Sequence, residues 1–82
     1  MLTHYTHEEL DFTRQLGRRV RTLRAVHGLS QPDLGALVGL SRQAVTAVER
    51  GTVAVSLVNL RRLAQALEVP MATLVDGPLI IQ

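Results

Sequence analysis

The chain contains no cysteine, tryptophan or lysine, and only one tyrosine and one phenylalanine among its 82 residues. Without cysteine it forms neither a disulfide nor a thiolate metal site. So few aromatic rings offer no platform for stacking single-stranded bases. The longest apolar runs, such as residues 78–81, are far too short to cross a membrane. The first residues lack the charged start and apolar stretch of a secretory signal, so we expect a soluble cytoplasmic protein.

Arginine is concentrated in one part of the chain. All nine basic residues are arginine, and five of them lie within residues 14–24, a stretch without any acid. Glu8, Glu9 and Asp11 come immediately before it. The guanidinium group presents a planar fork of donors that fits phosphates and guanine edges. Genome base composition is enough to explain arginine in place of lysine, so the clustering is the feature that bears on function.

Apolar residues recur at helical spacing along the chain, and no stretch keeps the alternation that is typical of a strand. Because the length allows a single domain, the sequence predicts a compact all-α fold of five helices joined by short turns. Residues 78–82 are expected to form either a short C-terminal strand or an apolar tail.

The first helix is predicted to run from about His7 to His27, with Gly28 as its left-handed end. Residues 6–9 have the Thr-x-x-Glu form of a capping box, although the pattern also allows a start as late as Asp11. A protonated His27 in the last turn would complement the helix dipole. The apolar stripe of this helix consists of Phe12, Leu16, Val20 and Leu23.

Two short helices follow and meet at a tight turn. Ser30 caps the first of them, which is predicted to end at Gly39. Ser41 caps the second, which is predicted to run to about Arg50 and to stop at Gly51. The residues expected to be buried are Leu34, Leu37 and Val38 in the first helix and Val45 and Val48 in the second.

Two further helices complete the predicted fold. Ser56 caps the fourth, and Pro70, at a first helical position, starts a short fifth helix that ends before Gly77. The apolar stripe of the fourth helix consists of Leu57, Leu60, Leu63, Ala64 and Leu67.

The segment from Gln31 to Arg50 has the residue pattern of a helix-turn-helix. Where the two helices cross, the fifth position must be small, and Gly35 occupies it. The ninth position favours a left-handed conformation, which Gly39 supplies. The apolar positions that fasten the unit to a core are all filled, by Leu34, Val38, Leu40, Val45 and Val48. So many matches at fixed spacing make a specific signal.

The sequence over about residues 14–77 resembles the DNA-binding domains of Xre/Cro-type phage repressors. The resemblance lies in residues 28–31, 39–43 and 48–51, and in the stretch from Ser56 to Pro70. It implies a five-helix domain whose third helix enters the major groove of duplex DNA. The chain accordingly divides into an N-terminal extension with the start of the first helix (1–10), the helix-turn-helix domain (11–77) and the tail (78–82).

The outward face of the third helix is the candidate DNA-reading surface. Helical periodicity turns five of its residues outward, namely Arg42, Gln43, Thr46, Ala47 and Arg50. In similar repressors the positions of Arg42, Gln43 and Ala47 face base edges. Arginine fits guanine and glutamine fits adenine, whereas Thr46 offers a hydroxyl or methyl group. Ala47 offers only an apolar contact where other repressors carry a polar residue. A solvated helix face is the alternative.

Four residues are candidates for contacts with DNA phosphates, which position a protein without specifying sequence: Gln31, Ser41, Arg50 and Arg24. The resemblance assigns this role to Gln31, and an ordinary polar residue of a first turn is the alternative. Ser41 caps its helix in either case. In similar domains an arginine at the position of Arg24 pairs with the glutamate at the position of Glu49. We therefore expect an Arg24–Glu49 pair that leaves Arg24 within reach of a phosphate, against the alternative of two unpaired charges.

No other grouping of residues indicates chemistry. His4 and His7 are too weak a pattern for a metal site, and we expect neither metal nor cofactor. Arg61 and Arg62 are interpreted as a solvated helix face. No Cys–His or Ser–His–Asp grouping and no glycine-rich phosphate loop stands out, so we do not expect an enzyme.

The function predicted is that of a sequence-specific transcriptional regulator, a repressor that binds double-stranded DNA as a homodimer on a palindromic operator. One short helix reads few base pairs, so two copies on half-sites about 10 base pairs apart are expected. Three alternatives stay open: a DNA-binding antitoxin partnered by a toxin, a restriction–modification controller, and a helix-turn-helix module that bridges proteins. Residues 79–81 are apolar enough to buttress the dimer, unless they form a disordered or truncated tail.

Overall fold

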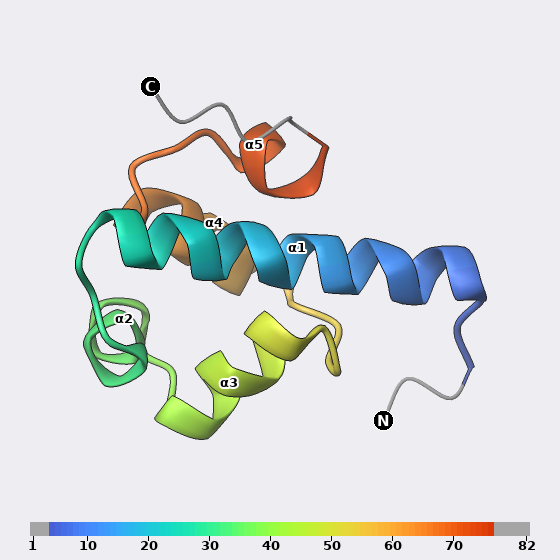
Figure 1. Ribbon diagram of the computed structural model, residues 1–82, viewed down its shortest axis with the longest axis horizontal. Helices are drawn as coiled ribbons and strands as arrows, with labels where there is room; N and C mark the ends of the chain where they lie inside the picture. The colour runs from blue at the N-terminus through green and yellow to red at the C-terminus, as the bar shows by residue number, and fades with distance from the viewer. Residues whose placement is uncertain (1–3, 77–82) are drawn as a thin grey trace.

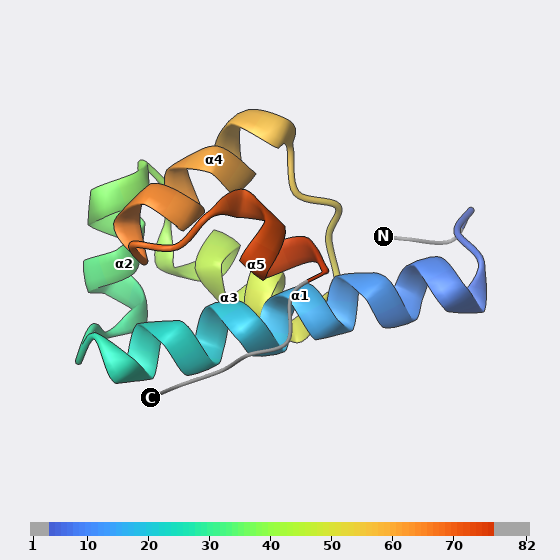
Figure 2. The same ribbon diagram turned by 90° about the horizontal axis from the view of Figure 1, so that it is seen from above.

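The computed structural model describes residues 4–76, which form five α-helices and no strand. In chain order these are α1 (His7–Val26), α2 (Gln31–Val38), α3 (Arg42–Arg50), α4 (Leu57–Ala66) and α5 (Met71–Val75). The long α1 crosses the middle of the view in Figure 1, with α5 above it and α2 and α3 below it, and in Figure 2 it lies along the lower edge of the molecule. The predicted all-α fold is confirmed. Gly77 and the predicted tail, residues 78–82, lie outside the described residues.

The helices pack in a closed ring. α3 and α5 lie directly on α1, α2 packs on α3 and α4, and α4 packs on α5. Apolar side chains fill the centre of this ring, and the largest of those that are fully buried are Leu34, Leu63, Leu67, Leu74, Val20, Val38 and Val45. Burying each such side chain contributes about 1.5–3 kcal/mol relative to leaving it in water. The core is therefore shared by all five helices.

The helix starts lie where the caps predict them. The Thr6 hydroxyl accepts a hydrogen bond from the Glu9 amide at 3.1 Å, and the Glu9 carboxylate accepts one from the Thr6 amide at 2.8 Å. This reciprocal cap starts α1 at His7 and excludes the later start. Ser30, Ser41 and Ser56 each accept from the amide three residues further on. A side-chain acceptor replaces the partner that a first-turn amide lacks.

Two side chains, one from α1 and one from its C-cap, form hydrogen bonds with the C-terminal ends of α4 and α5. His27, the C-cap residue of α1, donates from Nε2 to the carbonyl oxygen of Leu67 at 2.9 Å. Arg19 donates to the carbonyl oxygen of Leu74 at 3.1 Å. The first bond joins the end of α1 to the end of α4, and the second joins α1 to α5.

Three residues predicted to be buried are exposed. Phe12 is 46% exposed, because the first turns of α1 extend past the other helices (Figures 1 and 2). Leu37 is 62% exposed, because the buried side of α2 is centred between Leu34 and Val38 and Leu37 lies about 80° away from that centre. Leu57 is 73% exposed, because it lies in the first turn of α4, beyond the part that packs on α2 (Figure 2).

The start of α5 also differs from the prediction. Pro70 has φ −62° and ψ 150°, an extended conformation, and is the N-cap residue of α5. The first helical residue is Met71. The helix therefore starts one residue later than the proline pattern predicts.

Gly17 sets the distance between α1 and α3. It lies in the middle of α1 and is buried. A side chain there would collide with the carbonyl oxygens of Val48 and Glu49, near the end of α3. The lack of a side chain at Gly17 therefore lets the two backbones approach closely, a requirement that the apolar pattern of α1 does not show.

Replacing Gly17 with alanine is expected to lower the free energy of unfolding by about 1–3 kcal/mol, although alanine is the better helix former. The added methyl group forces α1 away from α3. Urea denaturation followed by circular dichroism measures the change. Thr22→Ala, at an exposed position of the same helix, is the control and should change stability by less than about 0.5 kcal/mol. A Gly17→Ala protein as stable as wild type would contradict the close crossing.

Glu68 is a position where glycine should stabilise the fold. It follows α4 with φ 58°, and among the described residues it is the only non-glycine residue with positive φ. Glu68→Gly is expected to raise the free energy of unfolding by about 0.5–1 kcal/mol, because relief of the left-handed strain exceeds the entropy lost on ordering glycine. The melting temperature reports the change. Glu68→Ala keeps the strain, and an equal gain with alanine would show that the backbone conformation is not the cause.

Candidate nucleic-acid interface

The turn between α2 and α3 brings these helices into close contact. Gly39 has φ 73°, a left-handed conformation that glycine adopts without steric cost. The Leu40 amide donates to the carbonyl oxygen of Gly35 at 2.9 Å, and a side chain at Gly35 would collide with the carbonyl oxygen of Leu40. Both glycines therefore serve the roles that the helix-turn-helix pattern assigns to them. The apolar positions of the pattern are buried, except that Leu40 is half-buried.

The first turn of α2 is fixed by a second reciprocal cap. The Asp33 amide donates to the Ser30 hydroxyl at 3.1 Å, and the Ser30 amide donates to the Asp33 carboxylate at 2.9 Å. These hydrogen bonds with Ser30 lower the pKa of the Asp33 carboxyl group. The cap places Gln31 at the first helical position, where its side chain points towards α3.

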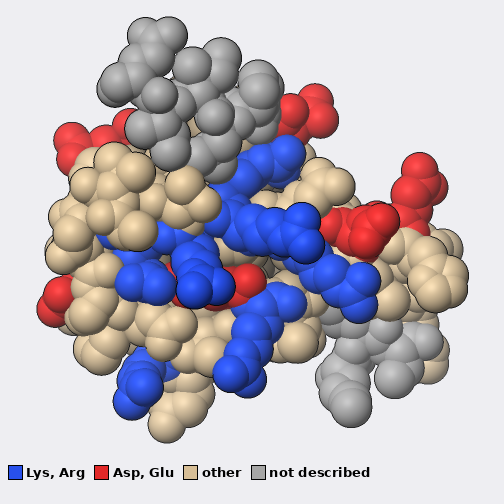
Figure 3. All heavy atoms as spheres, viewed as in Figure 1, with Lys and Arg blue, Asp and Glu red and all other residues tan. Residues whose placement is uncertain are grey.

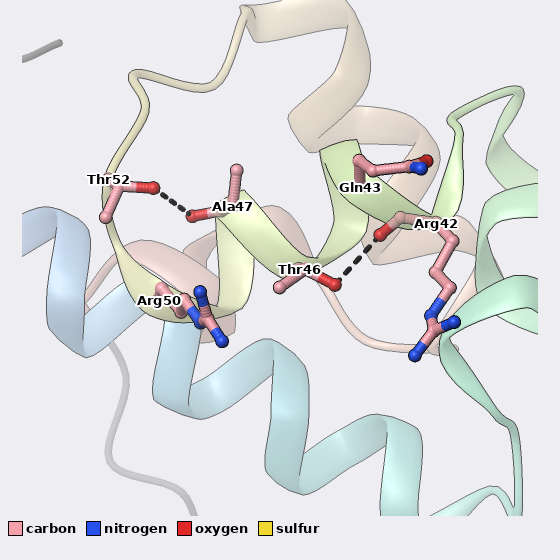
Figure 4. Close-up of a pocket in the computed structure, with 6 residues that line it drawn as sticks. All are labelled: Arg42, Gln43, Thr46, Ala47, Arg50 and Thr52. Carbon is pink, nitrogen blue, oxygen red and sulfur yellow. Dashed lines mark hydrogen bonds between the residues drawn. The ribbon is translucent and has the colours of Figure 1, made fainter.

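The outward face of α3 carries the residues predicted to read DNA. Arg42, Gln43 and Arg50 are exposed, and Thr46 and Ala47 are half-buried. In Figure 4, Arg42 and Arg50 leave α3 on one side, and Gln43 and Ala47 leave it on the other. The face is hollowed into a shallow recess lined by Arg42, Gln43, Thr46, Ala47, Arg50 and Thr52.

A network of hydrogen bonds behind this face ties α3 to α1 and α2. Arg24 of α1 donates from Nε to Glu49 Oε2 at 2.6 Å and from a terminal nitrogen to Glu49 Oε1 at 3.0 Å. Gln31 donates from Nε2 to the same Oε1 at 3.1 Å. The Thr46 hydroxyl donates to Gln31 Oε1 at 2.9 Å. The expected Arg24–Glu49 pair is present, and the network extends it to two further side chains.

The ion pair at the centre of the network is largely shielded from water. The side chains of Arg24 and Glu49 are 16% and 4% exposed. The side-chain hydrogen bond with Glu49 raises the pKa of Arg24 by more than burial lowers it. The remaining terminal nitrogen of Arg24 donates to the carbonyl oxygen of Leu29 at 2.8 Å. All three guanidinium nitrogens are thus bonded within the protein, so the pair holds α3 in place against α1.

The network also determines which of the predicted contact residues remain free. Gln31 uses both ends of its amide within the protein, and the Thr46 hydroxyl is shared between Gln31 and the Arg42 carbonyl oxygen at 3.0 Å. No hydrogen bond or ion pair within residues 4–76 engages the side chains of Arg42, Gln43 or Arg50. The donors and acceptors available for a partner are therefore mainly those of these three residues.

Ser41 combines its two predicted features in one group. Its hydroxyl oxygen accepts from the Ala44 amide at 3.1 Å, which caps α3. Ser41 is exposed, and its hydroxyl hydrogen remains available to an acceptor outside the protein.

Positive charge gathers over α1 and α3. Figure 3 shows arginine side chains clustered on the face formed by these helices, with most acids at its margins. The exposed arginines are Arg14, Arg18 and Arg21 on α1 and Arg42 and Arg50 on α3. Charges of one sign on one face attract a polyanion and raise its rate of association.

Two residues of this region were missed by the sequence patterns. Thr52 follows the left-handed Gly51, donates to the Ala47 carbonyl oxygen at 3.2 Å and lines the recess on α3. It belongs to no helical stripe, so periodicity gives no sign of it. Arg21 lies on α1 beside the network. The sequence indicates it only as one of the five arginines within residues 14–24 and predicts no contact for it.

The described part of the chain contains no group of three or more His, Cys, Asp or Glu side chains placed to hold a metal ion. None of its helices is both long and apolar enough to span a membrane.

Comparison with known proteins gives consistent matches. A family model described as a helix-turn-helix domain matches residues 15–76. An uncharacterized HTH-type transcriptional regulator of Bacillus subtilis (strain 168), YgzD, is 40% identical over 53 residues, which make up 65% of this chain and 80% of the relative. The hypothetical transcription factor NHTF from Neisseria is 33% identical, with a TM-score of 0.78 over 95% of this chain and 90% of that structure.

Two further solved structures are similar over nearly their whole length. The restriction–modification controller protein C.AhdI from Aeromonas hydrophila is 44% identical, with a TM-score of 0.74 over 83% of this chain and 98% of that structure. The P22 c2 repressor, solved in complex with a synthetic operator, is 32% identical, with a TM-score of 0.75 over 80% of this chain and 100% of that structure.

Removing the Arg24 side chain is expected to lower the free energy of unfolding by about 2–4 kcal/mol, because a buried Glu49 carboxylate is left without its counter-ion. Adding Glu49→Gln to Arg24→Ala should restore at least half of the loss. The matched control is Arg14→Ala. Arg14 lies 3.7 Å from Asp11 in an exposed pair, so its loss should cost less than about 1 kcal/mol. Equal losses for Arg24→Ala and Arg14→Ala in urea denaturation would show that the buried pair contributes no more than a surface pair.

Proposed function

The chain belongs to the helix-turn-helix family, and on this premise we propose that it is a sequence-specific transcriptional regulator that binds double-stranded DNA. It acts as a repressor, as a homodimer on a palindromic operator. The proposal assigns it no enzymatic activity and no cofactor. Support comes from the P22 c2 repressor, which has the same fold and was solved with an operator bound.

One observation carries the proposal. Arg42 and Gln43 are exposed at the start of α3, and no hydrogen bond or ion pair within the described residues engages their side chains. A helix of this kind fits the major groove, where arginine bonds guanine O6 and N7, and glutamine bonds adenine N6 and N7. Thr46 and Ala47 contribute apolar contacts to a thymine methyl group. The Thr46 hydroxyl is already engaged with Gln31 and contributes less.

The homodimer follows from the size of the reading helix. α3 has nine residues, and such a helix contacts only a few base pairs. Two copies related by a twofold axis bind two half-sites about 10 base pairs apart, which supplies affinity and explains a palindromic operator. Three groups around α3 contact phosphates of the DNA backbone. These are the Ser41 hydroxyl, the N-terminus of α2 at Gln31 and the Arg50 guanidinium group.

A second candidate function is control of a restriction–modification system. It is favoured by the 44% identity to C.AhdI, a restriction–modification controller that this chain covers over 98% of its length. The two candidates share the same DNA-binding chemistry. They differ in the genes that are regulated, which for a controller are those of a restriction–modification system. The antitoxin and protein-bridging alternatives have no comparable observation in their favour.

Selection from a random duplex library, followed by titration of the enriched sites, tests the proposal. We expect a palindromic site bound at about 10⁻⁸ M or tighter at physiological salt, far more tightly than bulk DNA. Weak binding without sequence preference, lost as the salt concentration rises, would overturn it and move the function to a protein partner.

Arg42→Ala is expected to weaken binding to the selected site by about 1–3 kcal/mol and to relax the preference at one base position of each half-site. The loss arises because the bidentate contact with guanine is removed. A fluorescence titration against the selected site and its single-base variants measures both effects. Arg61→Ala, exposed on α4, is the matched control and should bind like wild type. A uniform loss over all sequences for Arg42→Ala would make Arg42 a backbone contact instead.

A further inference from the structure

A second recess lies beside the reading face, between α1 and α3. It is lined chiefly by charged side chains, namely Arg21 and Arg24 of α1 and Arg42, Arg50 and Glu49 of α3. Four guanidinium groups thus surround a single carboxylate. The sequence patterns assign no role to Arg21, and the proposed base contacts do not use it.

The only carboxylate of the recess is already neutralised. Glu49 accepts two hydrogen bonds from Arg24, at 2.6 Å and 3.0 Å, and a third from Gln31. The other terminal nitrogen of Arg24 donates to the Leu29 carbonyl oxygen, so all three of its guanidinium nitrogens make a hydrogen bond within the protein. Within residues 4–76 no carboxylate forms an ion pair with Arg21, Arg42 or Arg50. Three positively charged side chains therefore line one recess without a carboxylate among the described residues to neutralise them.

The position of Arg21 follows from the crossing at Gly17. Residues four and seven positions after Gly17 lie on the same face of α1, and these are Arg21 and Arg24. The close approach at Gly17 turns this face towards α3. Arg24 reaches inward to Glu49, whereas Arg21 is exposed at the mouth of the recess. Arg18, in the neighbouring row of α1, does not line the recess.

We propose that Arg21, together with Arg50, holds one phosphate group of the DNA backbone in this recess. The inference rests on the proposed function, since it requires α3 to lie in the major groove. A groove is bordered by phosphates, and α1 lies beside α3, so side chains at the border of the two helices face the backbone and not the bases. Figure 4 shows Arg50 on the side of α3 opposite Gln43 and Ala47; Arg42 leaves on the same side as Arg50, but from the other end of the helix.

The chemistry of the recess favours a phosphate over other groups. Guanidinium forks bind phosphate oxygens with two parallel hydrogen bonds, and charge-assisted bonds of this kind are about twice as strong as neutral ones. Arg24 serves here as a positioning residue, because each of its three guanidinium nitrogens bonds to Glu49 or Leu29 and its side chain is largely shielded from water. The sequence predicts a phosphate contact for Arg24, and the recess adds Arg21, one turn earlier on α1, as the exposed guanidinium group nearest to it in the chain that lines the same recess.

The test is the salt dependence of binding to the selected duplex. Each phosphate contact contributes about 0.9 to the slope of log K against log salt, so replacing both arginines that hold the phosphate, in Arg21→Ala/Arg50→Ala, should reduce the magnitude of the slope by about 0.9, and Arg21→Ala should account for part of this reduction. Between 50 and 200 mM salt, the wild-type loss of affinity should exceed the loss for the double variant by about 3.5-fold. The selected base preferences should not change, because a phosphate contact carries no sequence information.

Arg61→Ala is the control, because it removes the same charge from an exposed position on α4, outside the recess and outside the positive face of α1 and α3. It should leave the slope as in wild type. An unchanged slope for Arg21→Ala, or equal changes for Arg21→Ala and Arg61→Ala, would overturn the recess as a phosphate site. Either result leaves the proposed function intact if wild type still selects a palindromic site. Wild-type protein that selects no site would overturn the proposed function and this inference together.

Discussion

The close crossing of α1 over α3 is the constraint on which the rest of the molecule depends. Gly17 allows the two backbones to approach, and at that separation the guanidinium group of Arg24 reaches the carboxylate of Glu49 at 2.6 Å. α3, whose outward face carries the proposed DNA-reading residues, is therefore held on its inner side by an ion pair as well as by the buried Val45 and Val48. A helix of nine residues would be marginal in water by itself, so its order comes from this support.

The side chains of α3 divide into sets that point in different directions. Val45 and Val48 enter the core, and Thr46 and Glu49 join the network with α1 and α2. The remaining polar side chains, on the outward face, have no partner among the described residues. Because a well-packed core and a bonded network are both costly to rearrange, the outward side chains are presented on a rigid support. Such preorganisation reduces the ordering that binding would otherwise require.

Local signals predicted the helices well, because a cap such as Thr6 or Ser30 depends on residues only three positions away. The helix-turn-helix pattern placed Gly35 and Gly39 correctly for the same reason. Burial was predicted less well, and the buried positions given to Leu37 and Leu57 were wrong. Periodicity shows which stripe a residue occupies but not how far the neighbouring helices extend.

At the candidate site, the Arg24–Glu49 pair was expected only through the family resemblance. The bonds that Gln31 makes with Glu49 and Thr46 depend on how three helices sit together, which no local pattern contains. That arrangement has a consequence for divergence among such domains. Arg42 and Gln43 stand outside both the core and the network, so exchanging them costs the fold little. If these two residues read the bases as proposed, new target sequences can evolve at their positions while the scaffold is inherited unchanged.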